Sequence, residues 1–288
     1  MKRYDIAIIG TGPAGVSAAI TSKIRNKEII LLGSADLSDK LSKAHQIDNY
    51  PGLPAISGEE FGQRLKDHLD ELGIEITDKR VNAVYSMGEY FTVQADEDMI
   101  EAATVIVAAG VMQGRPLPGE EEFLGRGVSY CATCDGRLYK GKKAAVLGYS
   151  SDAGEEAEYL AEIGVDVLFF PIGAGVSLPA ESERLKLVKE TPKAITGDMK
   201  ARALETSEHI YDTDCVFVLR DAVAPGNLVP GIETEGAHIR VNLAMETNIA
   251  GLYACGDIAG QPYQYVKAAG QGNIAALSAV QYLNKKKA

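Results

Sequence analysis

The 288-residue chain has few cysteines, no excess of positive charge and no long hydrophobic segment. Four cysteines are too few for a secreted disulfide framework in a chain of this length. The net charge of −11 disfavours an extended contact with nucleic acid or with an anionic membrane surface. No apolar run approaches the length of a transmembrane helix. These absences predict a cytoplasmic protein that binds neither nucleic acid nor a membrane.

The distribution of apolar residues predicts an α/β fold with two strand–helix–strand units. A content of 46% hydrophobic residues is typical of a globular core, and the length favours two domains. No helix or strand is predicted for the polar stretch 181–208. The predicted strands are 4–9, 28–32, 81–84, 90–93, 105–109, 143–147, 165–170, 214–219 and 252–255, and the predicted helices are 13–25, 61–72, 153–163 and 270–283.

The segment "IIGTGPAG" has three glycines between an apolar strand and a helix. Gly10 permits the tight turn, Gly12 permits close approach of a pyrophosphate, and Gly15 lets the helix pack against the strand. An acidic residue usually ends the second strand and binds the ribose, but here Gly33 and Ser34 follow that strand. The pattern predicts a dinucleotide site at the N-terminus of the chain.

The segment "LYACGDIAG" is a second nucleotide signal, far away in the sequence. A short strand ends at Gly256-Asp257, just before a helix. In flavoproteins an aspartate at this position accepts hydrogen bonds from the ribityl chain. The alternative role of Asp257 is to cap the helix, and the two roles are compatible.

The segment "YCATCDG" carries the most reactive side chains of the chain. Cys131 and Cys134 have the spacing that forms a disulfide readily and lowers the pKa of a thiolate. Two cysteines are half of a zinc site, and no second pair completes it, so we predict no metal. Asp135 either exchanges the proton that thiol chemistry needs or caps the turn. Cys215 and Cys255 lie in apolar runs and are expected in the core.

The segments "GTGPAG", "NYPG", "GRGVSYCATCDG", "GEEAEYL" and "ACGDIAG", in this order, resemble the low-molecular-weight thioredoxin reductases over nearly the whole chain. The resemblance implies two Rossmann-like, three-layer ββα domains and a homodimer. It implies an FAD domain in two parts, 1–112 and 223–288, and a smaller inserted domain at 113–222. It also implies bound FAD and a redox-active disulfide between Cys131 and Cys134.

The resemblance assigns roles to individual residues. Cys134 would face the flavin, Cys131 would attack the disulfide of thioredoxin, and Asp135 would be the acid. Asp257 would bind the ribityl chain, and Asn49 would lie near the isoalloxazine ring. The remaining expected FAD contacts are Gly10, Gly12, Pro13, Ala14, Gly15, Gly33, Ser34, Val81 near the adenine, Ala109, Gly110, Gly256, Gln264 and Tyr265.

The chain departs from the family pattern at two places near the expected flavin. Members have Gly-Gly-Gln where this chain has Ser38-Asp39-Lys40, and Arg-Gln-Ala where it has Tyr263-Gln264-Tyr265. The two tyrosines either stack on the flavin or have a packing role.

The largest departure lies in the second strand–helix–strand unit. NADPH-dependent members have Gly-x-Gly-x-x-Ala and then His-Arg-Arg, whereas this chain has Gly148-x-Ser150-x-x-Ala153 and then Pro171-Ile172-Gly173. No Lys or Arg occurs between Lys143 and Arg184. Each missing charged hydrogen bond is worth roughly 1.5–3 kcal/mol, so NADPH binding should be lost. NADH would require an acidic residue at the end of the second strand, and none is present.

In lacking these nicotinamide-binding motifs, the chain resembles the ferredoxin-dependent flavin thioredoxin reductases, a branch of the same family. This branch implies that reduced ferredoxin supplies electrons through FAD to the disulfide and then to thioredoxin. Ferredoxin is usually acidic, so docking would need a basic patch, for which Lys40, Lys43, Arg115 and Lys267 are the candidates.

Three alternatives remain at this stage. The first is a thioredoxin reductase that binds NAD(P)H in an atypical way. The second is an FAD-dependent dithiol oxidase, disfavoured because such oxidases tend to have histidine in place of Asp135. The third is a flavin-binding redox sensor without enzymatic activity, which the intact CATCDG segment disfavours.

Overall fold

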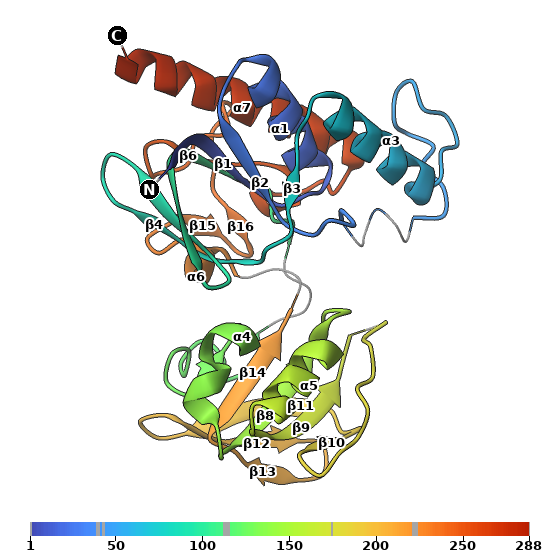
Figure 1. Ribbon diagram of the computed structural model, residues 1–288, viewed down its shortest axis with the longest axis vertical. Helices are drawn as coiled ribbons and strands as arrows, with labels where there is room; N and C mark the ends of the chain where they lie inside the picture. The colour runs from blue at the N-terminus through green and yellow to red at the C-terminus, as the bar shows by residue number, and fades with distance from the viewer. Residues whose placement is uncertain are drawn as a thin grey trace. The chain divides into compact units, whose positions relative to one another are not determined.

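The computed structural model describes residues 2–38, 41, 44–111, 116–173, 175–220 and 224–287. The chain divides into two compact units: unit 1 comprises residues 1–111 and 224–288, and unit 2 comprises residues 112–223 (Figure 1). The boundaries expected from the sequence, after residues 112 and 222, fall among residues outside the described part, and they stay a prediction. None of the helices in the described part is both long and apolar enough to cross a membrane.

Unit 1 is built on a seven-stranded sheet in the order β3-β2-β1-β6-β5-β4, with β17 also paired to β6. The strands β1, β2, β3, β6 and β17 pair in parallel with one another, whereas β5 pairs antiparallel with β6 and β4 antiparallel with β5. The bounds are β1 (Arg3–Ile9), β2 (Ile29–Leu32), β3 (Ile76–Thr77), β4 (Val81–Ser86), β5 (Phe91–Ala95), β6 (Asp98–Val107) and β17 (Leu252–Ala254).

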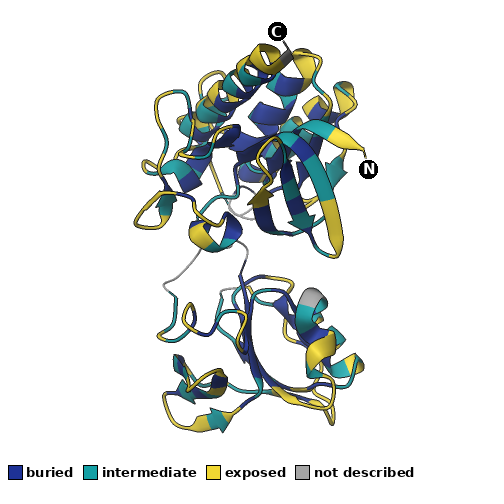
Figure 2. Cartoon of the chain, turned by 90° about the vertical axis from the view of Figure 1, so that its left-hand side faces the viewer, coloured by how far each residue is buried: buried dark blue, intermediate teal, exposed yellow. Residues whose placement is uncertain are grey.

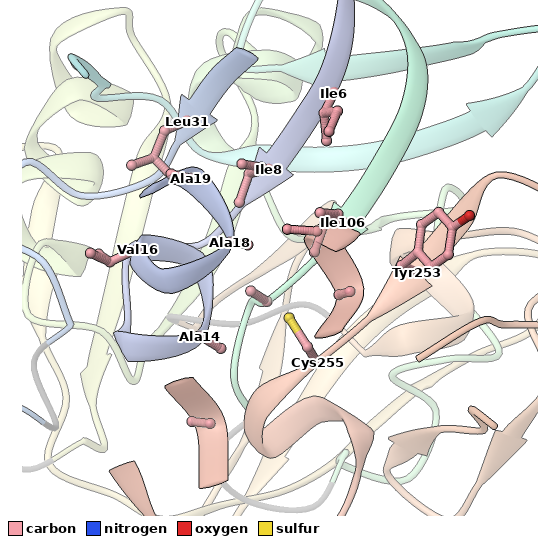
Figure 3. Close-up of a cluster of buried hydrophobic side chains, with 14 of the residues drawn as sticks. Ile6, Ile8, Ala14, Val16, Ala18, Ala19, Leu31, Ile106, Tyr253 and Cys255 are labelled. Carbon is pink, nitrogen blue, oxygen red and sulfur yellow. The ribbon is translucent and has the colours of Figure 1, made fainter. Parts of the chain in front are cut away.

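Three helices pack against one face of this sheet: α1 (Pro13–Ile24), α3 (Gly58–Glu71) and α7 (Tyr265–Lys287). Alternate residues of β1, Ile6 and Ile8, join the same cluster as Ala14 of α1 and Cys255, as Figure 3 shows. Helix α3 begins at a capping-box sequence, in which Ser57 Oγ accepts a hydrogen bond from the backbone amide of Glu60. Smaller elements of unit 1 are α6 (Pro225–Leu228), β15 (Thr234–Glu235), β16 (His238–Ile239) and the 3₁₀ helix η2 (Gly256–Ala259).

Unit 2 contains a five-stranded parallel sheet in the order β10-β9-β8-β14-β7. Val146 of β8 faces the helix α5, whereas its neighbours Ala145 and Leu147 face a separate three-stranded antiparallel sheet. The bounds are β7 (Val128–Ser129), α4 (Ala132–Asp135), η1 (Gly136–Tyr139), β8 (Lys143–Gly148), α5 (Ala153–Glu162), β9 (Asp166–Pro171), β10 (Leu185–Leu187), β11 (Pro192–Gly197), β12 (Ala201–Thr206), β13 (Ile210–Asp212) and β14 (Cys215–Leu219).

The α/β fold class with two Rossmann-like units is confirmed, and the sheet strands are buried inside each unit (Figure 2). The prediction of no helix or strand in residues 181–208 is wrong, because this stretch contains β10, β11 and β12. Only a few residues of each of these strands are buried, such as Ile195 of β11 and Leu204 of β12, so the strands look polar in sequence. The last helix is longer than expected and begins at Tyr265.

Candidate functional site

The glycine loop of unit 1 has the geometry that its sequence predicts. Gly10 has φ +108°, and a Cβ there would lie 2.3 Å from the carbonyl oxygen of Ala108. A Cβ on Gly15 would lie 1.8 Å from the carbonyl oxygen of Gly10. Among the residues that the structure describes, a Cβ on Gly12 would meet only the Cβ of Ser38, at 3.7 Å. Gly10 and Gly15 are therefore needed for packing, whereas the side of Gly12 is open to a ligand.

The loop leads into a helix N-terminus that no side chain caps. Gly12 is the N-cap of α1 in extended conformation, and Pro13 follows at the first helical position. The first turn of a helix carries unpaired amides and a partial positive charge, which favour an anion such as a pyrophosphate. Pro13, Ala14 and Gly15 are all buried at this end.

The residues that follow the neighbouring strands lie against the loop. Thr11 Oγ1 donates a hydrogen bond to the carbonyl oxygen of Ser34 at 2.9 Å, and a Cβ on Gly33 would lie 3.1 Å from Thr11. A Cβ on Gly10 would lie 3.1 Å from the Cα of Ala109, and the next residue, Gly110, has φ +73°. The structure thus brings the segments after β1, β2 and β6 to one edge of the sheet.

The second nucleotide signal lies at the same place. Gly256 has φ +80°, and a Cβ there would lie 2.8 Å from the Cβ of Ala14. The turn that carries Asp257 is therefore packed against the first turn of α1, although the two segments are far apart in the sequence. Lys267 donates to the carbonyl oxygens of Gly256 and Gly260, so this lysine is engaged inside unit 1 and is a poor docking cation. The other docking candidates, Lys40, Lys43 and Arg115, lie outside the described residues.

The predicted flavin-ring residues are brought together only in part. Asn49 Nδ2 donates to Gln264 Oε1 at 2.6 Å, across 215 positions of sequence. Tyr265 packs edge-on against Phe61 at a ring distance of 6.2 Å. Val81 begins β4, three positions from β1 in the strand order, and its place near the adenine stays a prediction.

Tyr263 is exposed, and its hydroxyl lies 2.7 Å from Nε2 of His238. Asp39 and Lys40, in the segment that departs from the family pattern, lie outside the described residues.

The residues of unit 1 fit FAD. The open side of Gly12 and the N-terminus of α1 lie next to the turn that carries Asp257, which comes from a distant part of the chain. These groups would hold the pyrophosphate and the ribityl chain, respectively.

The segment of unit 2 that contains Cys131, Cys134 and Asp135 forms a short turn after β7. Cys131 precedes the four-residue helix α4, and its side chain is 7% exposed. Its Sγ lies 3.3 Å from Thr133 Oγ1. The side chain of Cys134 lies outside the described part. The remaining cysteines, Cys215 and Cys255, are free, and burial raises the pKa of each thiol to about 12.

Ser129 contacts two of the predicted catalytic residues, which the sequence argument missed. Its hydroxyl donates to Asp135 Oδ2 at 2.7 Å and accepts from the backbone amide of Cys131 at 3.1 Å. Ser129 is 5% exposed and ends β7, which is paired with β14, so its position is set by the sheet. The serine within "GVSYC" was the available signal, but its spacing alone does not reveal its partner.

The acidic first turns of α5 have specific partners. Glu156 Oε2 accepts a hydrogen bond from the amide of Ala132, at the start of the redox helix α4. Glu158 Oε1 accepts from the amide of Ala180. These carboxylates occupy the N-terminal part of a helix that, in a nucleotide-binding domain, would face a pyrophosphate.

In unit 2, the loop 148–153 corresponds to a nucleotide-binding loop, and backbone amides of this loop donate hydrogen bonds to the protein itself. The backbone amides of Tyr149 and Ser150 both donate to the carbonyl oxygen of Leu219, at 2.8 and 3.1 Å. Ile172 and Gly173 donate to the carbonyl oxygen of Gly148, and a Cβ on Gly173 would lie 2.1 Å from Tyr149 O. Two amides that a phosphate would need are thus already bonded.

A buried ion pair follows the end of β14, beside β8, at the position where a doubly wound sheet has its ligand crevice. Arg220 Nη1 bonds to Glu120 Oε1, and the side chains are 2% and 0% exposed. The guanidinium carbon also lies 4.3 Å from the ring centre of Tyr149. Burial opposes the charge of Arg220, but the contacts with Glu120 outweigh it and raise its pKa. In a doubly wound sheet this crevice, where the strand order reverses, is the usual ligand site.

The fold and the two sites define a class of protein. A profile of the pyridine nucleotide-disulphide oxidoreductase family matches residues 4–272, and the chain belongs to this family. Among its relatives are thioredoxin reductases: one from Aquifex aeolicus is 34% identical over 99% of this chain and 95% of its own length. One from Bacillus subtilis is 32% identical over 99% of this chain and 96% of its own length.

A solved structure gives a narrower similarity. A ferredoxin-flavin thioredoxin reductase from Clostridium acetobutylicum is 50% identical, covers 100% of this chain and 99% of its own, and superimposes with a TM-score of 0.95. A thioredoxin reductase from Gloeobacter violaceus is 29% identical, covers 99% of this chain and 96% of its own, and gives a TM-score of 0.84.

Proposed function

We propose that this chain is a flavoprotein thioredoxin-disulfide reductase that takes electrons from reduced ferredoxin rather than from NADPH. The similarity to the Clostridium acetobutylicum enzyme supports the class and the donor. The observation that carries the choice of donor is the state of the second nucleotide loop. Its Tyr149 and Ser150 amides are bonded to Leu219 O, and the buried pair of Arg220 and Glu120 lies against Tyr149.

We assign the cofactor contacts to unit 1. The open side of Gly12 and the N-terminus of α1 hold the pyrophosphate of FAD, and the carboxylate of Asp257 binds the ribityl chain. When bound, FAD supplies a carrier that accepts electrons and passes a pair to a disulfide. Asn49 and Gln264, joined by their hydrogen bond, are assigned to the flavin-ring end of this site.

The thiol chemistry belongs to Cys131, Cys134 and Asp135. Reduction of a Cys131–Cys134 disulfide leaves two thiols, and the thiolate of Cys131 attacks one sulfur of the thioredoxin disulfide. Cys134 then attacks Cys131, which breaks the mixed disulfide and releases thioredoxin as a dithiol. Asp135 holds or supplies the proton that the thiolates exchange. Because Cys131 is 7% exposed, this sequence requires its sulfur to become accessible to thioredoxin.

Anaerobic reduction of the purified protein tests the donor. Reduced ferredoxin should bleach the flavin absorbance and support thioredoxin reduction, whereas millimolar NADPH or NADH should not bleach it quickly. The variant Ser150→Gly should remain insensitive to NADPH, because the missing cations and the bonded amides persist. Rapid, stoichiometric bleaching of the unmutated protein by NADPH would return the chain to the nicotinamide-dependent reductases.

We also propose a homodimer in the cytoplasm. The family resemblance supports the dimer, and exposed apolar side chains on α1 and α7, including Ile24, Ile274 and Leu277, offer a surface for it. A protein with few cysteines that works through a dithiol is typical of a reducing compartment such as the cytoplasm. Light scattering on the holoprotein should give twice the mass of one chain, and a single-chain mass at micromolar concentration would contradict the dimer.

A further inference from the structure

Lys267 holds the turn that carries Asp257. Its Nζ donates to the carbonyl oxygen of Gly256 at 2.8 Å and to that of Gly260 at 2.5 Å. These two carbonyls bracket the 3₁₀ helix η2, in which Asp257 is the second residue. The residue is half-buried, and its ammonium is bonded to these two backbone carbonyls.

Gln271, one helical turn further along α7, completes the attachment. Its Oε1 accepts a hydrogen bond from the amide of Gly256 at 3.0 Å. Both backbone polar groups of Gly256 are therefore bonded to side chains of α7. Because the peptide unit is planar, fixing the carbonyl of Gly256 also fixes the direction of the amide of Asp257 and the start of that residue.

Helix α7 is fixed in turn against the glycine loop. A Cβ on Gly272 would lie 2.0 Å from the carbonyl oxygen of Ala14, so the two helices meet at backbone distance. One helix thus carries the lysine that holds the Asp257 turn and the glycine that packs on the pyrophosphate helix. The two halves of the expected FAD site, far apart in the sequence, are joined through α7.

The charge of Lys267 has a local role. Burial lowers the pKa of the ammonium, and the nearby carboxylate of Asp257 opposes this shift. A half-buried lysine that bonded nothing would be costly, since each buried charge needs partners. Here the partners are the carbonyls that bracket Asp257.

We propose that Lys267 is a positioning residue for FAD: it holds the Gly256–Gly260 turn, and so the carboxylate of Asp257, in the orientation that the ribityl chain requires. The proposal rests on the FAD site of the proposed function and is independent of the electron donor. Lys267 acts through Asp257.

FAD dissociation from the full-length holoprotein tests this role, measured as the rise of FAD fluorescence on dilution. Lys267→Met should raise the dissociation constant about 10- to 100-fold, the effect of about one charged hydrogen bond. Lys267→Arg keeps the charge and several donors, and it should recover most of the affinity. Lys193→Met, at an exposed lysine of unit 2, is the matched control and should leave the dissociation constant unchanged.

A double-mutant cycle separates positioning from general stability. In an Asp257→Ala background, Lys267→Met should add less than about threefold, because the residue it positions is gone. Full additivity, or a dissociation constant within twofold of the parent for Lys267→Met alone, overturns the proposal.

If Lys267→Met does not fold, Lys267→Gln is compared instead, since it removes the charge and keeps one donor. An unchanged dissociation constant for that variant also overturns the proposal. An unmutated protein that binds no FAD would instead overturn the cofactor site of the proposed function, so the two failures are distinguishable.

Discussion

The hydroxyl of Ser129 donates to Asp135 Oδ2 at 2.7 Å and links the end of β7 to the acid that follows the two cysteines. The hydroxyl oxygen of Ser129 also accepts a hydrogen bond from the backbone amide of Cys131. One buried serine therefore fixes both the backbone of the expected nucleophile and the carboxylate of the expected acid.

We expect Asp135→Asn to slow thioredoxin reduction by roughly 10²–10⁴-fold, the usual contribution of a proton-transfer group, without loss of FAD. Ser129→Ala should slow it by about tenfold, because one hydrogen bond to a charged group is lost. Steady-state rates with reduced ferredoxin and thioredoxin give both values, with the flavin absorbance as the measure of FAD content. Ser129→Thr keeps the hydroxyl and serves as the control. An unaltered rate for Asp135→Asn would leave Asp135 with a capping role.

The two cysteines should differ in their reaction with thioredoxin. Cys134→Ser leaves Cys131 able to attack but removes the residue that resolves the mixed disulfide, so a covalent complex should accumulate. Cys131→Ser should form none. Non-reducing gel electrophoresis after incubation with oxidised thioredoxin separates these outcomes, with the double variant as the blank. Trapping by Cys131→Ser alone would reverse the assigned roles.

The other two cysteines should be inert in the folded protein. Both are fully buried, and a thiol pKa of about 12 leaves roughly one thiolate in 10⁴ molecules at pH 8. In the Cys131→Ser/Cys134→Ser protein, Ellman's reagent should label neither Cys215 nor Cys255 until a denaturant is added. Stoichiometric labelling of the native protein within minutes would show that the structure around Cys215 or Cys255 opens readily.

Arg220→Met should destabilise unit 2 by about 3–5 kcal/mol, because it leaves the buried carboxylate of Glu120 without its partner. Combining it with Glu120→Leu should recover part of that loss. The exposed pair Arg184–Asp166 is the control, for which Arg184→Met should cost about 0–1 kcal/mol. Urea unfolding measures the three values. Similar losses for the buried and exposed arginines would mean that the buried pair is readily replaced by solvent.

Several features of this protein follow from local sequence patterns. The glycine loop at Gly10–Gly15, the strand–helix–strand units and the Cys131–Cys134 spacing are each contained within a few tens of residues. Backbone sterics and the helix and strand periods act over that range, so these features are visible in a single sequence. The missing cations after Pro171 are visible for the same reason.

The partners of distant side chains depended on the tertiary structure. Glu120 and Arg220 are 100 positions apart, and their pairing exists because β14 lies beside β8 in the sheet. Lys267, expected as a docking cation, bonds to backbone carbonyls because α7 packs against the Asp257 turn. Composition and spacing show that a charge is present, but strand order and helix packing decide which group it meets, since both depend on contacts between residues far apart in the chain.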